Sequence, residues 1–354
     1  MLPFTNPPQH LCIIRLSAIG DCVHTVAMVQ AIQKQWPQTN ITWIMGKVEA
    51  MLLNDLPGIN VIPFDKKAGL SGYIAIWKQL RKTRFDAILH LQSALRASVL
   101  TLGLKSRYIL GFDKIRASDG QTWFTNVKVP SPTSMHVLNG FMAFASRLGI
   151  NTLSATWHIP TSEQHDVWAR EIINNEPTLL ISPAASKPYK NWTIEGYAAL
   201  ADHAADQGLR VILCGGPSPL EQQMASDIIT LCKSKPLNLI GKTNLKQLMA
   251  LIKQAHCVLA PDTGPTHMAT AANTPVVGLY AHHNPERTGP YNSQQYVVSV
   301  YKQLIEQETG KTVSALPWRT RLKNEDAMQH ITIESVKCSL DKLLQDFPIS
   351  KDSY

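Results

Sequence analysis

Two aspartates lie directly after apolar, strand-like runs, and each precedes a sequence typical of a helix. Asp21 ends the turn in CIIRLSAIGDCVHT, and Asp262 opens the turn in CVLAPDTGPTHMATAA. A carboxylate at a helix start commonly serves as a cap, yet it can also remove a proton from a hydroxyl group. In the second turn Gly264 lets a ligand approach the backbone, and the N–H groups of a helix start attract anions. The sequence therefore offers a candidate base in its first half and a candidate anion site in its second.

Three further positions could contact a nucleotide. Lys190, in SKPYKNW, lies between a strand and a helix and could balance the charge of a diphosphate, although exposed loop lysines are common. Glu221, in CGGPSPLEQQ, could accept hydrogen bonds from a ribose, but an acidic residue early in a helix is also favoured by the helix dipole. His267 lies about one turn into its helix, where a diphosphate contact and a core position are both open.

Several common kinds of site are missing from the sequence. There is no Walker motif, no GxGxxG after the first strand, no DxD pair, no HExxH and no GxSxG. The adjacent His282 and His283 are poorly spaced to bind one metal, and we expect them on a polar surface. The six cysteines form no CxxC motif and are expected to be buried thiols in a reducing compartment. We therefore expect a mechanism without metal or cofactor.

The elements that position these residues follow an alternating pattern. With 354 residues, 44% of them hydrophobic and 17% charged, the chain is expected to form two globular domains. Short β-branched runs alternate with helical patterns in both halves, which predicts an α/β fold with two parallel sheets covered by helices. We expect an N-terminal domain over residues 1–160 and a second domain over 161–330. A helix and tail over 331–354 is expected to pack back on the N-terminal domain.

The positive charge is concentrated in the first half of the chain. Residues 1–150 contain 16 Lys and Arg against 7 Asp and Glu, whereas residues 151–354 contain 18 against 19. An acidic partner is therefore expected to meet the first half. Nucleic acid is disfavoured because no nucleic-acid-binding signature is present, while an anionic lipid surface remains a candidate. No apolar run is long enough for a membrane span, and the start resembles no signal peptide. The cationic candidates are Lys66, Lys67, Arg81, Lys82 and Arg84.

Five motifs occur in an order that resembles one enzyme family. RLSAIGDCVHT, DAILHLQ, SKPYKNW, CGGPSPLE and PDTGPTHMATAANTPVVGLY together resemble the bacterial ADP-heptose:lipopolysaccharide heptosyltransferases, glycosyltransferase family 9. The resemblance implies the GT-B arrangement, with two Rossmann-like domains facing a central cleft. It also implies an inverting, metal-independent transfer, with the acceptor bound by the N-terminal domain and the nucleotide sugar by the C-terminal domain.

The resemblance assigns roles to particular residues. Asp21 matches the family's candidate base, and Lys190 matches its phosphate-binding lysine. The expected partners are ADP-heptose and an acceptor containing lipid A and Kdo, met by a monomer in the cytoplasm at the anionic inner membrane. The loop AHHNPERTGPY departs from the family's usual Gly-Pro-Thr-x-Pro lead-in. The remaining donor contacts implied by the resemblance are Ser186, Glu221, Asp262, Thr263, Gly264 and His267.

Three alternatives stay open at this point. The chain could use another nucleotide-activated sugar or another glycan acceptor. It could bind a sugar or a nucleotide without turnover, although a base opposite an anion site is unnecessary for binding alone. A dinucleotide-dependent oxidoreductase is disfavoured because its glycine fingerprint is missing.

Overall fold

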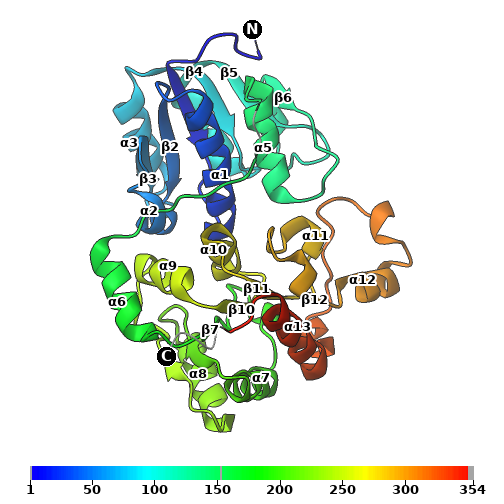
Figure 1. Cartoon of the computed structure of the whole chain (residues 1–354). Coiled ribbons are helices and arrows are strands. Elements are labelled where there is room, and N and C mark those ends of the chain that lie inside the picture. Colours follow the sequence, from blue (N-terminus) through cyan, green and yellow to red (C-terminus); the bar gives the residue numbers. More distant parts are fainter. Residues whose placement is uncertain (1, 152–153, 350–354) are drawn as a thin grey trace. The chain divides into compact units, whose positions relative to one another are not determined.

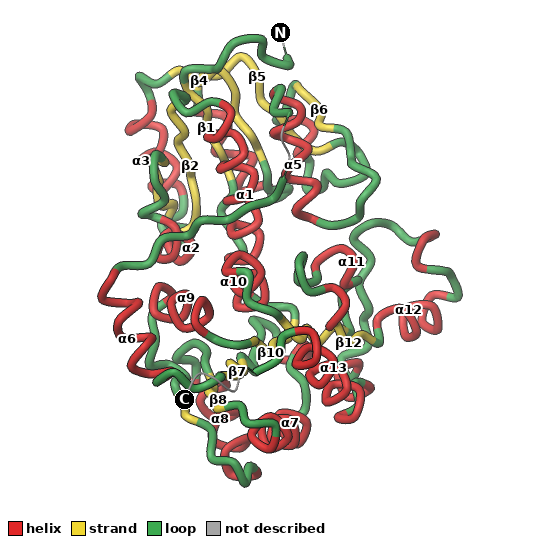
Figure 2. The backbone as a smooth tube through the Cα atoms, viewed as in Figure 1, coloured by secondary structure: helices red, strands yellow, loops and turns green. Residues whose placement is uncertain are grey.

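The computed structural model describes residues 2–151 and 154–349. Its chain divides into two compact units, Met1–Pro160 and Thr161–Tyr354. Each unit contains one six-stranded sheet in which all paired strands run parallel, with helices on both faces (Figures 1 and 2). Since parallel strands require crossover connections, each strand is joined to the next mainly through helices. The α/β class with two Rossmann-like parallel sheets is thereby confirmed.

The N-terminal sheet has the order β3-β2-β1-β4-β5-β6. Its central strands are continuous apolar runs because helices cover both of their faces. Leu11, on the central strand, is in register with Ile41 on one side and Ala87 on the other. The strands are β1 (His10–Ile14), β2 (Asn40–Gly46), β3 (Ile59–Phe64), β4 (Arg84–His90), β5 (Lys105–Phe112) and β6 (Val127–Val129). The α-helices are α1 (Ile19–Gln35), α2 (Lys47–Leu53), α3 (Leu70–Leu80), α4 (Leu95–Leu100) and α5 (Val137–Leu148).

The C-terminal sheet has the order β12-β11-β10-β7-β8-β9. Its strands are β7 (Thr178–Ile181), β8 (Arg210–Leu213), β9 (Leu237–Asn238), β10 (Cys257–Pro261), β11 (Val276–Tyr280) and β12 (Val297–Ser299). Its α-helices are α6 (Glu163–Ile173), α7 (Ile194–Asp206), α8 (Pro219–Leu231), α9 (Leu245–Gln254), α10 (Gly264–Ala272), α11 (Pro285–Thr288), α12 (Tyr301–Thr309) and α13 (Ile333–Asp346). A short 3₁₀ turn, η3 (Pro188–Lys190), precedes α7.

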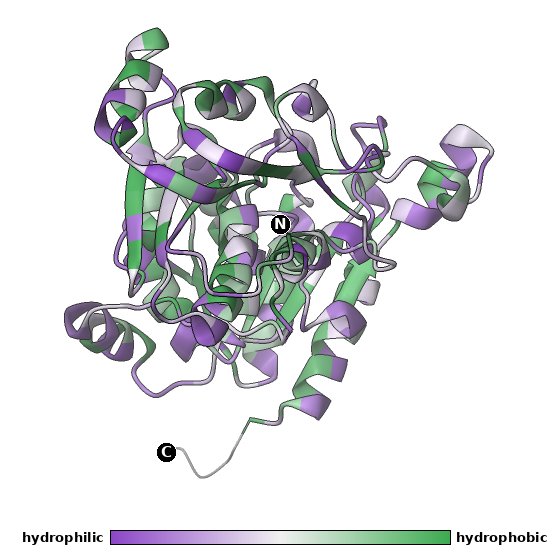
Figure 3. Ribbon diagram, turned by 90° about the horizontal axis from the view of Figure 1, so that it is seen from above, coloured by the Kyte–Doolittle hydropathy of each residue, from purple (hydrophilic) through white to green (hydrophobic). Residues whose placement is uncertain are grey.

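The last helix buries its apolar face in the C-terminal unit. Val336, Leu340 and Leu343 are fully buried in the core of that unit, where α13 packs against α7, β11 and β12. The prediction that residues 331–354 pack back on the N-terminal domain stays a prediction, and residues 350–354 of that segment lie outside the described residues. Figure 3, coloured by hydropathy, shows hydrophilic and hydrophobic residues alternating along the helices.

The three-residue strands β6 and β12 were not predicted. The apolar run LNLIG is typical of a strand, and β9 covers two of its five residues. Edge strands this short carry too few residues to show a periodic pattern.

Among the described residues, no helix is both long enough and apolar enough to cross a membrane.

Candidate active site

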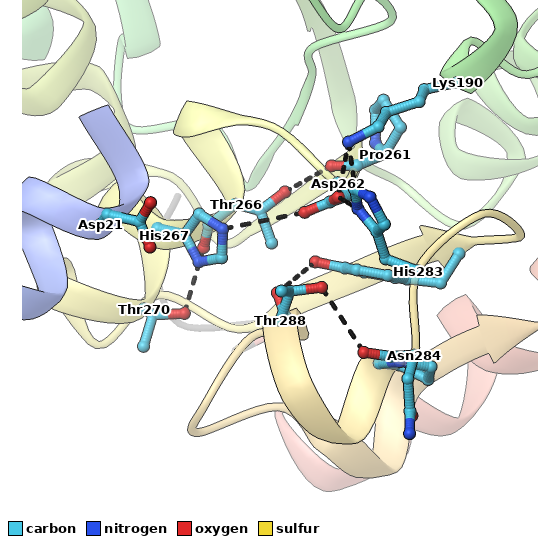
Figure 4. Close-up of polar contacts among 12 residues, drawn as sticks. Asp21, Lys190, Pro261, Asp262, Thr266, His267, Thr270, His283, Asn284 and Thr288 are labelled. Atoms are coloured by element: carbon cyan, nitrogen blue, oxygen red, sulfur yellow. Dashed lines mark hydrogen bonds and ion pairs between the residues drawn. The ribbon is translucent and has the colours of Figure 1, made fainter. Parts of the chain in front are cut away.

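A charged cluster lies where two neighbouring strands of the C-terminal sheet end. Asp262 directly follows β10, His283 follows the adjacent strand β11, and Lys190 ends η3 (Figure 4). Lys190 Nζ donates to Asp262 Oδ2 at 2.7 Å, and His283 Nδ1 lies 2.5 Å from the same oxygen. His267 Nε2 lies 4.0 Å from Asp262 Oδ1. The structure therefore brings the predicted residues Lys190, Asp262 and His267 together.

The charges around Asp262 determine its protonation. Its side chain is 15% exposed, and burial alone would raise the pKa of the carboxyl group. The hydrogen bond from His283 and the positive charges of Lys190, His283 and His267 outweigh burial, so the pKa of Asp262 is well below its usual range. Asp262 is thus a permanently charged anchor for cations and a very weak base.

The turn after β10 leads into α10 without a side-chain cap. Thr263 occupies the N-cap position, but its side chain makes no capping hydrogen bond. Gly264 and Pro265 form the first helical positions, and Thr266 Oγ donates to the Pro261 carbonyl at 2.7 Å. Asp262 does not cap α10, because its carboxylate contacts Lys190 and His283 instead. A helix start of this kind favours an anionic ligand.

The other predicted donor contacts lie in two further strand-to-helix turns of the same unit. Ser186 is exposed in the turn after β7. The Glu221 carboxylate accepts hydrogen bonds from the Gly216 backbone N–H and from Ser218 Oγ. A Cβ atom at Gly215 would lie only 2.6 Å from Glu221 Oε2, so a larger residue there would displace the Glu221 side chain. Glu221 thus stabilises its own turn in this structure, which is the alternative reading left open above.

Asp21 lies at the carboxyl edge of the N-terminal sheet. It occupies the first turn of α1, whose N-cap is Ala18, so Asp21 is not the capping residue. Its carboxylate pairs with Arg15, and its side chain remains 31% exposed. The Arg15 guanidinium is held from two other sides, by the Leu91 carbonyl at 2.6 Å and by the Phe141 ring, whose centroid is 5.2 Å away. This arrangement fixes Asp21 while leaving it accessible to a ligand.

The structure separates the five predicted cationic contacts into two groups. Lys66 and Lys67 follow β3 and lie at the same carboxyl edge as Asp21, whereas Arg84 begins β4 and lies at the amino edge. Arg81 and Lys82 lie just before Arg84 in the chain, separated from it by Thr83. The end of β3 and the start of β4 lie at opposite edges of the sheet, because the strands are parallel. The five residues therefore form no single patch.

Sequence reasoning missed two residues, one in each unit. Arg15 directly follows β1. A lone cation at the end of a strand-like run was the signal that could have identified it. His283 was assigned to a polar surface, which is wrong: its side chain is 21% exposed and contacts Asp262, while His282 is 4% exposed. The available signal was the position of the histidine pair. It follows β11, and β11 is the neighbour of β10, the strand that ends just before Asp262. Among the described residues, no three His, Cys, Asp or Glu side chains are grouped to hold a metal ion.

Comparison with known proteins places this geometry in a family. The profile of glycosyltransferase family 9 (heptosyltransferase) matches residues 73–318. The chain belongs to glycosyltransferase family 9. This heptosyltransferase is 47% identical over 341 residues to the lipopolysaccharide core heptosyltransferase OpsX of Haemophilus influenzae, covering 96% of this chain and 98% of the relative. The family resemblance stated from the motifs is thereby confirmed.

Solved structures agree with the fold of the enzyme. The E. coli ADP-heptose lps heptosyltransferase II superposes with a TM-score of 0.72 at 22% identity, covering 96% of this chain and 99% of that one. The E. coli heptosyltransferase WaaC with ADP gives a TM-score of 0.71 at 19% identity, covering 94% and 99%. At these identities the likeness establishes the fold alone, and it confirms the GT-B class.

Proposed function

We propose that this family 9 enzyme transfers heptose from ADP-heptose to the inner core, in the Kdo and heptose region, of lipopolysaccharide. The relative that is 47% identical is named a lipopolysaccharide core heptosyltransferase. Two solved structures of the same fold are named for ADP-heptose and for ADP. The observation that carries the proposal is the cation cluster around Asp262 beside the uncapped start of α10, which suits a diphosphate.

In the proposed donor site, Lys190 would contact the diphosphate of ADP-heptose. As the bond between the sugar carbon and the phosphate oxygen breaks, its electron pair passes to that oxygen. The ammonium group of Lys190 and the backbone N–H groups near Thr263 and Gly264 stabilise the developing charge. His267 adds positive charge when protonated. This set of fixed cations and dipoles supports a transfer that needs no metal ion.

In the proposed acceptor site, Asp21 accepts the proton of the attacking hydroxyl group. The hydroxyl oxygen attacks the sugar carbon from the face opposite the diphosphate, so the configuration inverts. General base catalysis of this kind contributes about 10²–10⁴-fold to the rate. The Arg15 pair orients the carboxylate, and its partial exposure leaves it open to the acceptor. Ser186 and Glu221 would complete the donor contacts.

The excess charge of the N-terminal half suits an acceptor that carries phosphates and acidic sugars. Lys66 and Lys67 lie at the edge of the sheet that also carries Asp21, and we assign the acceptor to this unit. The proposed setting is the cytoplasmic face of the inner membrane, with the enzyme as a monomer in peripheral contact with anionic lipid. Attraction of clustered Lys and Arg to such a surface is worth about 1 kcal/mol for each residue.

The test is a transfer reaction with ADP-heptose and a set of truncated lipopolysaccharide acceptors, analysed by mass spectrometry. We expect one acceptor to gain the mass of one heptose. Parallel thermal unfolding with ADP, UDP and NAD should show preferential stabilisation by ADP. Stabilisation by UDP alone, with no heptose transfer, would favour another nucleotide sugar as donor. Binding of ADP without turnover on any acceptor would contradict the proposed reaction.

A further inference from the structure

Lys190 and His283 share one oxygen atom of Asp262. Lys190 Nζ lies 2.7 Å from Oδ2, His283 Nδ1 lies 2.5 Å from it, and the two nitrogens are 3.2 Å apart. Since an ammonium group only donates hydrogen bonds, and a nitrogen this close to a carboxylate must carry a hydrogen, Nδ1–H points at Asp262. The other ring nitrogen, Nε2, is therefore the one that gains or loses a proton.

A diphosphate would compete with Asp262 for Lys190. The carboxylate is largely buried, and a buried charge that loses its only partner is strongly destabilised. Asp262 does not face this loss, because His283 stays on the same oxygen when Lys190 turns to another anion. An imidazolium compensates the negative charge of the carboxylate with a full positive charge, whereas a neutral imidazole offers only a hydrogen bond. Release of Lys190 is therefore easiest when His283 is protonated.

We propose that His283 is a positioning residue for the donor, which takes up a proton when a diphosphate draws Lys190 from Asp262. This inference rests on the proposed function, because the competing anion is the diphosphate of the nucleotide sugar. The proton comes from solvent, which reaches the imidazole because its side chain is 21% exposed. It adds to Nε2, while Nδ1–H remains on the carboxylate. The new N–H bond at Nε2 is the only covalent bond of His283 that forms or breaks.

Two ionisable neighbours of His283, namely His282 and Tyr280, are held in their neutral forms. Burial and the neighbouring charges of His283 and Lys190 lower the pKa of His282, whose Nε2 lies 3.0 Å from the Asn324 carbonyl. Burial raises the pKa of Tyr280, so that side chain stays neutral. The ionisable side chains of the elements around His283 are Lys190 and Tyr189 of η3, Asp262 after β10, His267 of α10, Tyr280 and His282 at the end of β11, Glu286 and Arg287 of α11, and Arg321 of the bridged loop.

The backbone holds His283 where it can perform this role. Its strand segment forms an isolated antiparallel bridge with Arg321, and the neighbouring His282 carbonyl accepts a hydrogen bond from the Leu322 N–H at 3.0 Å. The imidazole therefore stays next to Asp262 when Lys190 moves. Because binding favours protonated His283, ADP affinity should fall as the pH rises through the imidazole range, by at most tenfold for each pH unit.

Isothermal titration with ADP tests the proposal in the full-length protein and in His283→Gln. Titrations at pH 7 in two buffers of different ionisation enthalpy give the number of protons taken up for each ADP bound. The terminal phosphate of ADP also titrates in this range, so only the difference between variants is interpreted. We expect the unmodified protein to take up a larger fraction of a proton than His283→Gln. We also expect the unmodified protein to bind ADP about tenfold more tightly than His283→Gln at pH 6. This difference in ADP affinity should close toward pH 9.

Two further variants separate this role from a structural one. His203 forms another histidine–aspartate pair in the same unit, 2.7 Å from Asp341 and outside the site, so His203→Gln should match the unmodified protein in both measurements. His283→Lys keeps a permanent cation and should restore the affinity while abolishing the extra proton uptake. Equal proton uptake in His283→Gln and the unmodified protein would overturn the inference but leave the ADP site intact. No binding of ADP to the unmodified protein would overturn the proposed function itself.

Discussion

Replacing Asp21 with asparagine removes a charge at nearly constant volume. We expect a small loss of stability and a much larger loss of kcat. The stability effect follows from the surroundings of the carboxylate. Its ion pair with Arg15 is partly screened, because the Asp21 side chain is 31% exposed, and exposed pairs contribute about 0–1 kcal/mol. Its position in the first turn of α1 adds about 0.3–1 kcal/mol through the helix dipole. We expect a total loss of about 1 kcal/mol.

Arg15 limits this loss. When Asp21 is neutral, the guanidinium keeps the Leu91 carbonyl and the Phe141 ring as partners, so no buried charge is left alone. For a unit of this size, a loss of about 1 kcal/mol lowers the melting temperature by about 2–4 °C. The kinetic effect is larger, because losing a general base lowers kcat by about 10²–10⁴-fold. Even the lower limit corresponds to about 2.7 kcal/mol of barrier.

The assay measures kcat for heptose transfer at saturating donor and acceptor, together with ADP affinity and thermal unfolding. ADP affinity should be unchanged, since the proposed donor site belongs to the other unit. The matched control is Glu195→Gln, which removes an acidic side chain from the first turn of α7. This control should cost similar stability with no change in kcat. If kcat of Asp21→Asn stays within about threefold of the unmodified enzyme, Asp21 is not the base.

Other changes give further expected outcomes. Lys190→Ala should weaken ADP binding by about 10–100-fold, the worth of a charge-assisted hydrogen bond, measured by calorimetry; unchanged affinity would contradict its role. Because the pKa of Asp262 is depressed by folding, its stabilising effect is complete above about pH 4 and is lost as the pH falls further. The urea midpoints of the unmodified protein and Asp262→Asn should therefore converge in acid. Gly46→Ala should destabilise the protein by about 1–3 kcal/mol, because the new Cβ would lie 2.5 Å from the Leu16 carbonyl oxygen. In the native protein a thiol reagent should label the exposed Cys338 first and the four buried cysteines only on unfolding.

The fold was predictable from the sequence wherever a run was long and apolar. The central strands are long apolar runs, and the starts of α7 and α9 are marked by the capping residues Thr193 and Asn244. The short strands β6 and β12 were missed, because three residues at a sheet edge carry little pattern. The packing of α13 was also beyond the sequence. Its apolar periodicity predicted a buried face, but periodicity does not identify the surface that covers it.

The site shows the same division between local and nonlocal information. Asp21, Lys190 and Asp262 were predicted from turns that each form a continuous segment of sequence. The partners of these residues depend on strand order, which the sequence does not state. Arg15 and Asp21 are six positions apart, but Asp262 and Lys190 are 72 apart and meet only because β7 and β10 are neighbours. The contact of His283 with Asp262 likewise requires that β10 and β11 pair.

The two aspartates both lie between a strand and the helix that follows it, and their surroundings give them different chemistry. Asp262 is 15% exposed and faces Lys190, His283 and His267, so its pKa lies well below the usual range and it has little affinity for a proton. Asp21 faces a single guanidinium and is 31% exposed. A base must both reach a hydroxyl group and accept its proton, and Asp262 fails the second requirement. If one of these two carboxylates removes the acceptor proton, the charges around Asp262 exclude it and leave Asp21. Asp262 then holds the cations that we propose bind the departing diphosphate.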